Sequence, residues 1–452
     1  MFLSFILAIT QFLLIVIIVF QEYRRKSIGV FLWAMLLILF GIMHLSTVIA
    51  SYHDYPMWVY NYASLFVITF CMLYIITRKI FTCNKSITVC FKDKWLKVSP
   101  QSITKTQYIY IYITFCILCF CVWFRINELS KFSGSIMDTS WGSMREMSSE
   151  QNYANAGQLV TCLYCYSSSS ILLFYYWKKT RMAILSGLLV FSCVIISRNR
   201  VEVLPLLVAI IAYFIYNGTN LTIKKILMLL FIGVFSVVLI YALQIFRYYG
   251  SIYNFITNFD YHIFFDRIFT NMSEGKGDIG LREVFYYFIF HDNQFENFGE
   301  GHTYLRMLMF FIPTQWSAGL KPPDFAISMG SALGTGDAGF STHPTLFGDC
   351  FANFGYWGIL MGIFWAIFVT FTDNVVNKYN SSIKISFIIL YSNAYIVIGR
   401  GAVYNAFIES IGGSICILIV YKTILRFSNK RNHKTIKYDS KNRIQTEKQS
   451  TI

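Results

Sequence analysis

Charged residues are scarce in this sequence of 452 residues: they make up 13% of it, about half of the roughly 25% found in soluble domains. Hydrophobic residues reach 56%, and the mean hydropathy is +0.52. Such a composition excludes an ordinary soluble globular protein. It is typical of an integral membrane protein.

The signature motifs of several enzyme classes are also missing. We find no phosphate-binding P-loop, no His/Cys zinc signature, no paired acidic metal motif of the DxD type and no convincing Ser-His-Asp spacing. The eleven cysteines lie mostly within apolar runs or in one basic loop, which excludes an external disulfide framework. We therefore predict no metal and no cofactor, so any chemistry must come from the side chains themselves.

Eleven apolar runs recur along the chain, many of them close to the length that crosses a bilayer. They lie at residues 2–20, 28–50, 57–77, 108–124, 156–177, 182–197, 203–216, 226–243, 355–373, 386–398 and 402–421. The pattern predicts an all-α polytopic membrane protein with about eleven transmembrane helices and one large external loop.

The net charge of +15 could indicate a nucleic-acid partner, but the basic residues are distributed by membrane topology instead. Clusters such as "YRRK" at 23–26, "KKTR" at 178–181 and the tail after Lys422 occupy alternate connections. By the positive-inside rule these connections are cytoplasmic. We expect an external N-terminus, a cytoplasmic C-terminus and no nucleic-acid partner.

The order of the runs divides the chain into four parts. Residues 1–243 hold the first eight helices, 244–354 form the external loop, 355–421 hold the last three helices, and 422–452 form a basic cytoplasmic tail. The external loop is too long to be a simple connection, so function is sought there. Within it, "REVFYYFIFHDN" and "HTYLRMLMFFIPTQW" predict short interfacial or re-entrant helices.

Arg198, Arg200 and Glu202 lie in the short external link "SRNRVE", where the positive-inside rule predicts few arginines. A guanidinium is always charged, and its planar fork of donors matches the oxygens of a phosphate or diphosphate. One interpretation is therefore an anion site. The alternative is that the arginines reach to the membrane surface and form a local pair with Glu202.

Four further external arginines are candidates for the same site. Arg400 is the strongest, because it lies in a very short turn beside glycines that permit close backbone approach. Arg247 follows the eighth run, and Arg306 lies in "TYLRMLMF". Arg282 is the fourth, with pairing to Glu283 as its alternative role.

His343 precedes a proline, which fits poorly within a helix, so a loop or a helix start is predicted for it. An imidazole, with a pKa near about 6.5, can take a proton from a sugar hydroxyl or orient an acceptor. A purely structural role is the alternative. Asp349, six residues later, could orient the imidazole or accept the proton itself.

Three segments, in order, resemble stretches of the bacterial oligosaccharide repeat-unit polymerases, the O-antigen or capsule polymerases called Wzy. "SRNRVEVLPLL" resembles their Gly/Ser-x-Arg-x-Glu stretch. "GHTYLRMLMFFIPTQWSAGLKPPDF", which contains Tyr304, resembles their Gly-x-Thr-Tyr segment, and "STHPTLFGDCFANFGYWGI" their His-Pro-Thr stretch. The ligases of lipid-linked sugars are similar in architecture, with a His followed after a short interval by Gly-x-x-Gly. Here eleven residues separate His343 from Gly355, and Pro344 replaces a small polar residue, which favours the polymerase.

The resemblance implies glycosyl transfer at the outer face of the bacterial inner membrane, without metal or cofactor. A growing glycan on undecaprenyl diphosphate would be the donor, and a hydroxyl of a new lipid-linked unit would displace the lipid diphosphate. The arginines would bind the diphosphate, Glu202 would hold an arginine in place, Tyr304 would support the site, and His343 would act on the acceptor. Membrane lipid, a flippase and a chain-length regulator are the implied partners.

Two other classes of function remain as alternatives. A flippase for lipid-linked oligosaccharides would line a path with arginines, although flippases typically have two similar halves and this chain has one dominant loop. A membrane scaffold would not need external arginines that converge.

Overall fold

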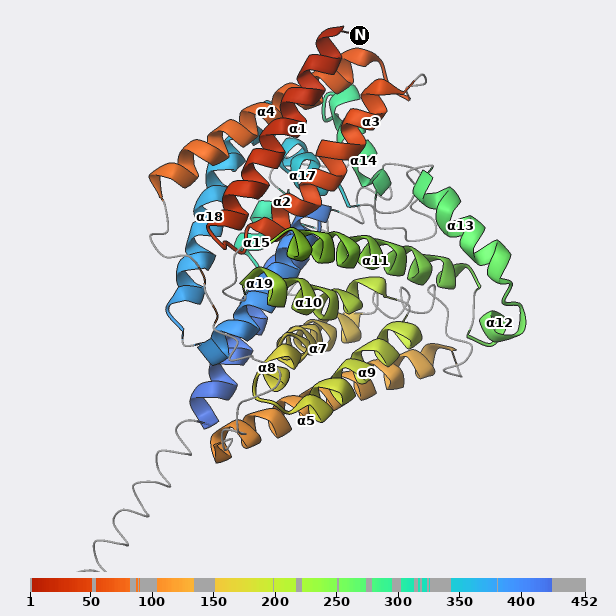
Figure 1. Ribbon diagram of the computed structural model, residues 1–452, viewed down its shortest axis with the longest axis vertical. Helices are drawn as coiled ribbons and strands as arrows, with labels where there is room; N and C mark the ends of the chain where they lie inside the picture. The colour runs from red at the N-terminus through yellow and green to blue at the C-terminus, as the bar shows by residue number, and fades with distance from the viewer. Residues whose placement is uncertain are drawn as a thin grey trace, which may run out of the picture.

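The computed structural model describes residues 2–50, 54–81, 87, 89, 104–133, 151–197, 199–216, 222–249, 252–273, 279–294, 302–312, 316, 317, 319–322, 325, 343–379 and 381–424. Helices dominate these ranges, which confirms the predicted all-α fold (Figure 1). Ten helical segments in the described part are long and apolar enough to cross a membrane. The protein is a multi-pass membrane protein.

The helices are, in chain order, α1 (Phe2–Arg24), α2 (Val30–Leu36), the π-helical η1 (Leu37–Ile42), α3 (Met43–Ile49), α4 (Met57–Ile80), α5 (Lys105–Ser133), α7 (Gln151–Ser169), α8 (Ile171–Tyr176), α9 (Thr180–Ser197), η3 (Arg200–Val203), α10 (Leu204–Tyr216), α11 (Ile223–Tyr248), α12 (Ile252–Thr257), α13 (Tyr261–Ser273), η4 (Ile279–Leu281), α14 (Arg282–Phe290), α15 (His302–Leu308), α17 (Thr345–Phe354), η7 (Gly355–Leu360), α18 (Met361–Asn377) and α19 (Ser381–Arg400). A final helix runs over Val403–Ile424. Membrane length is reached by α1, α2 to α3, α4, α5, α7 to α8, α9, α11, α17 to α18, α19 and the final helix.

Two predicted span boundaries differ from the structure. The run at 203–216 forms α10, whose 13 residues extend only about 20 Å at 1.5 Å per residue. A bilayer core is about 30 Å thick, so α10 is too short to cross it alone. The ninth span begins at Thr345 rather than at residue 355, because α17, η7 and α18 follow one another directly. The chain changes direction within this candidate span, because Gly355, with φ +54°, ends α17 and η7 packs against it.

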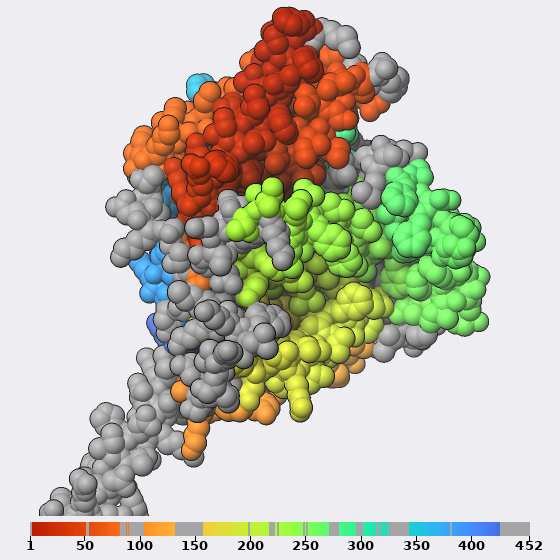
Figure 2. Space-filling model, in the orientation of Figure 1, coloured from red at the N-terminus to blue at the C-terminus, as the bar shows by residue number. Residues whose placement is uncertain are grey.

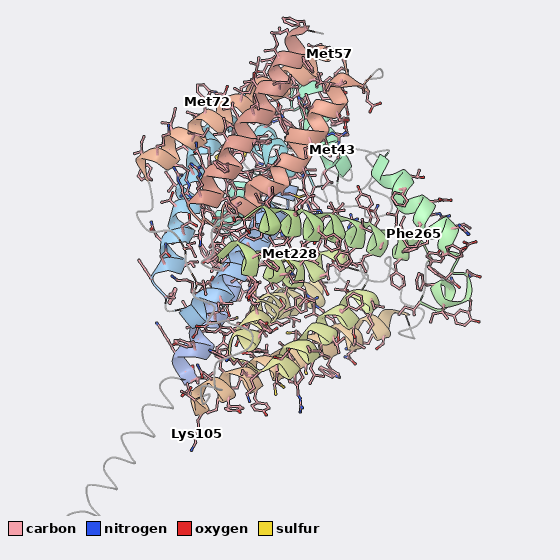
Figure 3. The ribbon with its side chains drawn as sticks, in the orientation of Figure 1. Met43, Met57, Met72, Lys105, Met228 and Phe265 are labelled. Atoms are coloured by element: carbon pink, nitrogen blue, oxygen red, sulfur yellow. The ribbon has the colours of Figure 1, made fainter. Side chains whose placement is uncertain are left out.

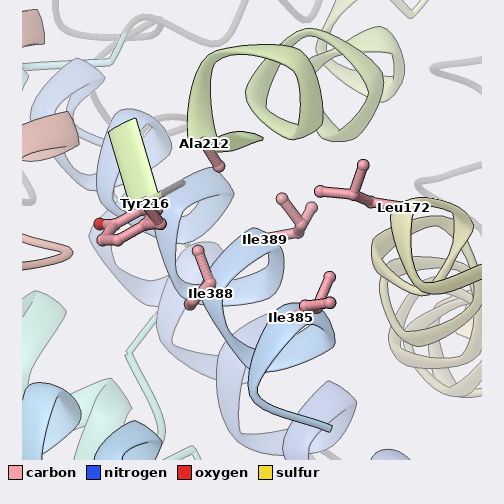
Figure 4. A pocket seen from close by; sticks show the side chains of 6 residues that line it. All are labelled: Leu172, Ala212, Tyr216, Ile385, Ile388 and Ile389. Atoms are coloured by element: carbon pink, nitrogen blue, oxygen red, sulfur yellow. The ribbon is translucent and has the colours of Figure 1, made fainter. Parts of the chain in front are cut away.

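The burial of the spans places α19 at the centre of the bundle. Of its membrane-length window 83% is buried, against 17% for α11. One face of α19 packs against α8 and α10, where Ile385, Ile388 and Ile389 meet Leu172, Ala212 and Tyr216 (Figure 4). These isoleucines are three and four residues apart, which puts them on one side of the helix. By contrast, α11 exposes Leu227 and Phe231, a surface suited to lipid.

Small and hydroxylated residues set the local breaks in these helices. Between α7 and α8, the Ser168 hydroxyl donates to the Tyr164 carbonyl one turn back, at 2.7 Å, a bond that competes with regular helical geometry. At η7, a Cβ on Gly358 would lie 2.4 Å from the Cys350 carbonyl oxygen. Glycine there lets η7 pack closely against α17.

A buried ionic group, which we call the Arg78 cluster (Glu22, Arg78 and Asp373), joins α1, α4 and α18. The Arg78 guanidinium donates to Glu22 through Nε at 2.9 Å and Nη2 at 2.5 Å, and to Asp373 at 2.9 Å. The hydroxyls of Ser27 and Thr370 accept from it as well, at 2.9 and 2.7 Å. All three charged residues are at most 2% exposed, so the cluster holds three spans together where α1 and α4 end.

Candidate functional site

The turn between α19 and the final helix rests on the segment that follows His343. Gly401 has φ +104°, and a Cβ there would lie 2.3 Å from the Thr345 backbone nitrogen and 2.9 Å from that of Pro344. Only glycine combines this backbone conformation with so close an approach. The turn therefore brings the end of α19, at Arg400, to the start of α17, just after His343.

A small pocket lies where these segments meet. Its water-accessible volume is only about 10 Å³, and it is lined by Thr303, Phe325, His343, Gly401, Ala402, Val403, Tyr404 and Asn405. His343 lies directly before α17, with Pro344 as the N-terminal cap residue. The prediction of a helix start for this histidine is confirmed.

Two cations lie beside the ring of Tyr404, and we call the three residues the Tyr404 cluster (Arg306, Lys321 and Tyr404). The Arg306 guanidinium lies 4.5 Å and the Lys321 ammonium 5.9 Å from the ring centroid, within range of a cation–π interaction. Arg306 also donates to the Pro322 carbonyl, and Lys321 to that of Ile312 at 2.9 Å. Burial, and then the charge of Arg306, lowers the pKa of Lys321.

Asp349 and Tyr304 connect α15 to α17 behind the pocket. The carboxylate of Asp349, which is fully buried, accepts from the Thr303 hydroxyl at 2.7 Å, and the Asn353 side chain accepts from the Thr303 backbone N–H at 2.9 Å. The Tyr304 hydroxyl lies 3.3 Å from the Cys350 sulfur. These contacts give both residues a positioning role, because they fix the helix that carries Arg306.

Glu202 lies in a second group, which we call the Glu202 cluster (Arg125, Arg200, Glu202 and Gln244). Its carboxylate forms an ion pair with Arg125 of α5, whose guanidinium also lies 4.4 Å from the centroid of the Tyr164 ring. Arg125 and Glu202 are both 7% exposed. Glu202 thus holds an arginine in place, as expected, but the arginine comes from a different part of the chain.

Arg200 of the Glu202 cluster contacts α11. It is 7% exposed, and its Nη1 donates to the Gln244 side-chain oxygen at 2.5 Å. The short helix η3 that carries Arg200 is capped by Asn199, whose side chain accepts from the Val201 N–H. Arg198, the other arginine of this link, lies outside the described residues.

The final helix carries one residue of the Tyr404 cluster and one acidic residue that interacts with the Glu202 cluster. Tyr404 lies in its first turn and Glu409 five residues later, and Glu409 interacts electrostatically with Arg125 and Glu202. Five residues of α-helix rise about 7.5 Å and turn by about 140°. Tyr404 and Glu409 therefore lie on different sides of this helix.

The remaining predicted arginines are not brought to the pocket by any described contact. Arg282 donates to the Thr47 hydroxyl at 3.1 Å and pairs with Glu283 at 3.2 Å, which is its alternative role. Burial raises the pKa of Glu283 to about 6, although Arg282 opposes this. Arg247 lies in α11, but its side chain is outside the described residues.

Sequence reasoning missed four residues of the site: Arg125, Gln244, Lys321 and Glu409. Arg125 directly follows the apolar run at 108–124, and a charge at the end of an apolar run is the same kind of signal that marks Arg200. Gln244 and Glu409 have no local signal, because their partners come from distant helices. Lys321 lies in the quoted "LKPPDF" stretch and was overlooked as a cation.

Comparison with known proteins identifies no family. No family model, curated protein or solved structure matches the chain. Its function has to be argued from the geometry of these clusters.

Proposed function

We propose that the protein is a membrane glycosyltransferase that polymerises oligosaccharide repeat units linked to a lipid diphosphate. One observation carries the proposal: two cations, Arg306 of α15 and Lys321 of the loop after it, lie beside the ring of Tyr404. Tyr404 in turn shares the lining of the small pocket with His343, which lies before α17. In this proposal the pocket faces the outer side of the bacterial inner membrane, because the positive-inside rule assigns the basic connections between spans to the cytoplasmic side.

The charge of the Tyr404 cluster suits an anionic ligand. Arg306 and Lys321 both lie on one ring and repel each other, since Arg306 lowers the pKa of Lys321. A diphosphate would relieve this repulsion and accept charge-assisted hydrogen bonds from both side chains. In the transfer reaction the same cations would stabilise the negative charge that develops on the leaving diphosphate. Arg400, which ends α19 beside the pocket, would add a further positive charge.

His343 is placed to act on the acceptor sugar. The acceptor hydroxyl oxygen forms a bond to the anomeric carbon of the donor, and the bond from that carbon to the diphosphate oxygen breaks. The electron pair leaves with the lipid diphosphate, and the hydroxyl proton passes to the His343 imidazole. The pocket lining supports this role because His343 shares it with the polar side chains of Thr303 and Asn405.

The Glu202 cluster would bind the second lipid-linked unit or its phosphate groups. Arg125 is ion-paired with Glu202, and Arg200, whose guanidinium donates to Gln244, would contact the anion. Arg125 would fix Glu202 and, through it, the link that carries Arg200.

Purified protein in lipid vesicles tests the proposal. Given lipid-diphosphate-linked repeat units and excess chelator, it should produce longer glycans, resolved by gel electrophoresis. Arg306→Gln should lower the initial rate about tenfold to a hundredfold, because a hydrogen bond to a charged group contributes about 1.5–3 kcal/mol. Arg267→Gln, an exposed arginine on α13, is the matched control and should keep the wild-type rate.

Two results would reject the polymerase. The first is movement of the units between leaflets with no growth in length, which would indicate a flippase. The second is full-length polymer from both Arg306→Gln and His343→Ala. Transfer of a glycan to a lipid A core acceptor, without polymer growth, would indicate a ligase.

A further inference from the structure

The hairpin of α12 and α13, which follows the end of α11, exposes a row of aromatic side chains. Tyr261, Phe265 and Phe269 are 59%, 50% and 66% exposed. They are spaced four residues apart, which puts them on one side of α13. Figure 2 shows the hairpin at the edge of the molecule, beside α11, and Phe265 is labelled in Figure 3.

The hairpin is attached firmly to the membrane span α11. Ile268, 1% exposed, forms a buried apolar cluster with Tyr241 and Ile245 of α11. Near the end of α11, the centroid of the Phe246 ring lies 4.7 Å from that of Phe255 in α12. The Phe255 centroid lies 5.0 Å from that of Phe259, between α12 and α13. The row of aromatics is therefore held in place while it remains exposed.

The surface of α11 shows what covers this row. Its apolar side chains Leu227, Phe231 and Val234 are 60%, 71% and 58% exposed, and in a multi-pass membrane protein such a face is covered by lipid. The aromatic row of α13 continues from the end of this lipid-facing helix. Aromatic rings at that level are typical of the membrane–water interface.

We propose that α12 and α13 lie on the outer leaflet, with Tyr261, Phe265 and Phe269 inserted among the lipid headgroups and upper acyl chains. The polar residues Thr270 and Arg267 lie about 140° and 160° around α13 from Phe265, so an aromatic side and a polar side are both present, as in an interfacial helix. This docking is independent of the proposed reaction.

The docked hairpin also sets the depth of the Glu202 cluster, a consequence that rests on the proposed function. Ile245 packs on α13, and its neighbour Gln244 accepts from Arg200. An interfacial hairpin would hold Gln244, and with it Arg200, at the level of the lipid headgroups. That is where the diphosphate of a lipid-linked sugar lies.

Site-specific photo-crosslinking tests the docking. The photoreactive amino acid p-benzoylphenylalanine replaces Phe265 or Phe269 in separate full-length proteins, each reconstituted in vesicles of phosphatidylethanolamine and phosphatidylglycerol. It replaces Thr270 as the control, a position about 140° around the helix from Phe265. After irradiation, mass spectrometry of the intact protein counts lipid adducts.

The proteins labelled at 265 and 269 should carry lipid adducts at several times the yield of the one labelled at 270. Equal yields at the three positions, or crosslinks from 265 and 269 to a second copy of the chain, would overturn the docking. The result does not depend on glycan synthesis. A protein that forms the lipid adducts but makes no polymer would refute the proposed function alone.

Discussion

Replacing Arg78 with methionine should destabilise the protein strongly, because it leaves two carboxylates buried with no cation between them. Arg78 makes three hydrogen bonds to Glu22 and Asp373 at 2.5 to 2.9 Å, and the three side chains are almost inaccessible to solvent. Breaking a buried ion pair by removing one partner costs about 3–5 kcal/mol. We expect a loss of this size for Arg78→Met.

We expect a smaller loss of stability when all three charged residues of the Arg78 cluster are made apolar. The triple variant Glu22→Met, Arg78→Met, Asp373→Leu removes every buried charge together. Replacing a buried ionic group by apolar residues of similar volume is often neutral or even stabilising by about 1–4 kcal/mol. The triple variant should therefore be clearly more stable than Arg78→Met alone.

Thermal unfolding in detergent with a thiol-reactive fluorophore measures this when Cys71 is the only cysteine left in each protein, because the exposed Cys116 would otherwise react before unfolding. Cys71 is buried in α4, two turns before Arg78, and becomes reactive only when the helices separate. Arg78→Met should unfold at a markedly lower temperature than the wild type, and the triple variant should recover most of the difference. A single variant as stable as the wild type, or a triple variant no better than the single one, would refute the argument.

Three further predictions concern the site and its surroundings. Gly401→Ala should reduce polymer synthesis and folded yield, because the new Cβ would lie 2.3 Å from the Thr345 nitrogen; a fully active variant in the vesicle assay would contradict the geometry. Arg125→Met and Glu202→Gln should each lower the unfolding temperature, because each leaves the charge of the buried partner unpaired; a variant as stable as the wild type would contradict this. Burial raises the pKa of Glu283 from the usual 4.5 to about 6, so the folded state binds this proton more tightly, and the residue's contribution to stability should fall as pH rises from about 4.5 to 6. Glu283→Gln should flatten that part of the stability–pH profile, and an unchanged slope would count against the shift.

The fold could be predicted because a transmembrane helix is a local signal. A run of about 20 apolar residues needs no distant partner to be recognised. The two differences in span boundaries lie where local composition is ambiguous. The run at 203–216 is apolar enough but forms a helix of only 13 residues. Residues 345–354 contain Asp349 and Asn353, which look too polar for a span because their hydrogen bonds to Thr303 are invisible in sequence.

The candidate site was only partly predictable for the same reason. His343, Arg306 and Arg400 each had a local signal: a proline, a charge in an apolar stretch and a short glycine turn. Their proximity depends on Gly401, whose contact with Thr345 joins segments far apart in sequence. No pattern within one segment could reveal that contact.

The structure also separates the charged residues that stabilise the bundle from those that are suited to bind a ligand. Arg78 and Arg125 each form an ion pair with a buried carboxylate, so their charge is already compensated within the protein. Arg306 and Lys321 instead contact backbone carbonyls and the Tyr404 ring, and neither forms an ion pair with any carboxylate in the described part of the chain. Two cations held close together repel each other. An anionic ligand would reduce that repulsion, which is why our proposal places the lipid diphosphate at the Tyr404 cluster rather than at the ion-paired arginines.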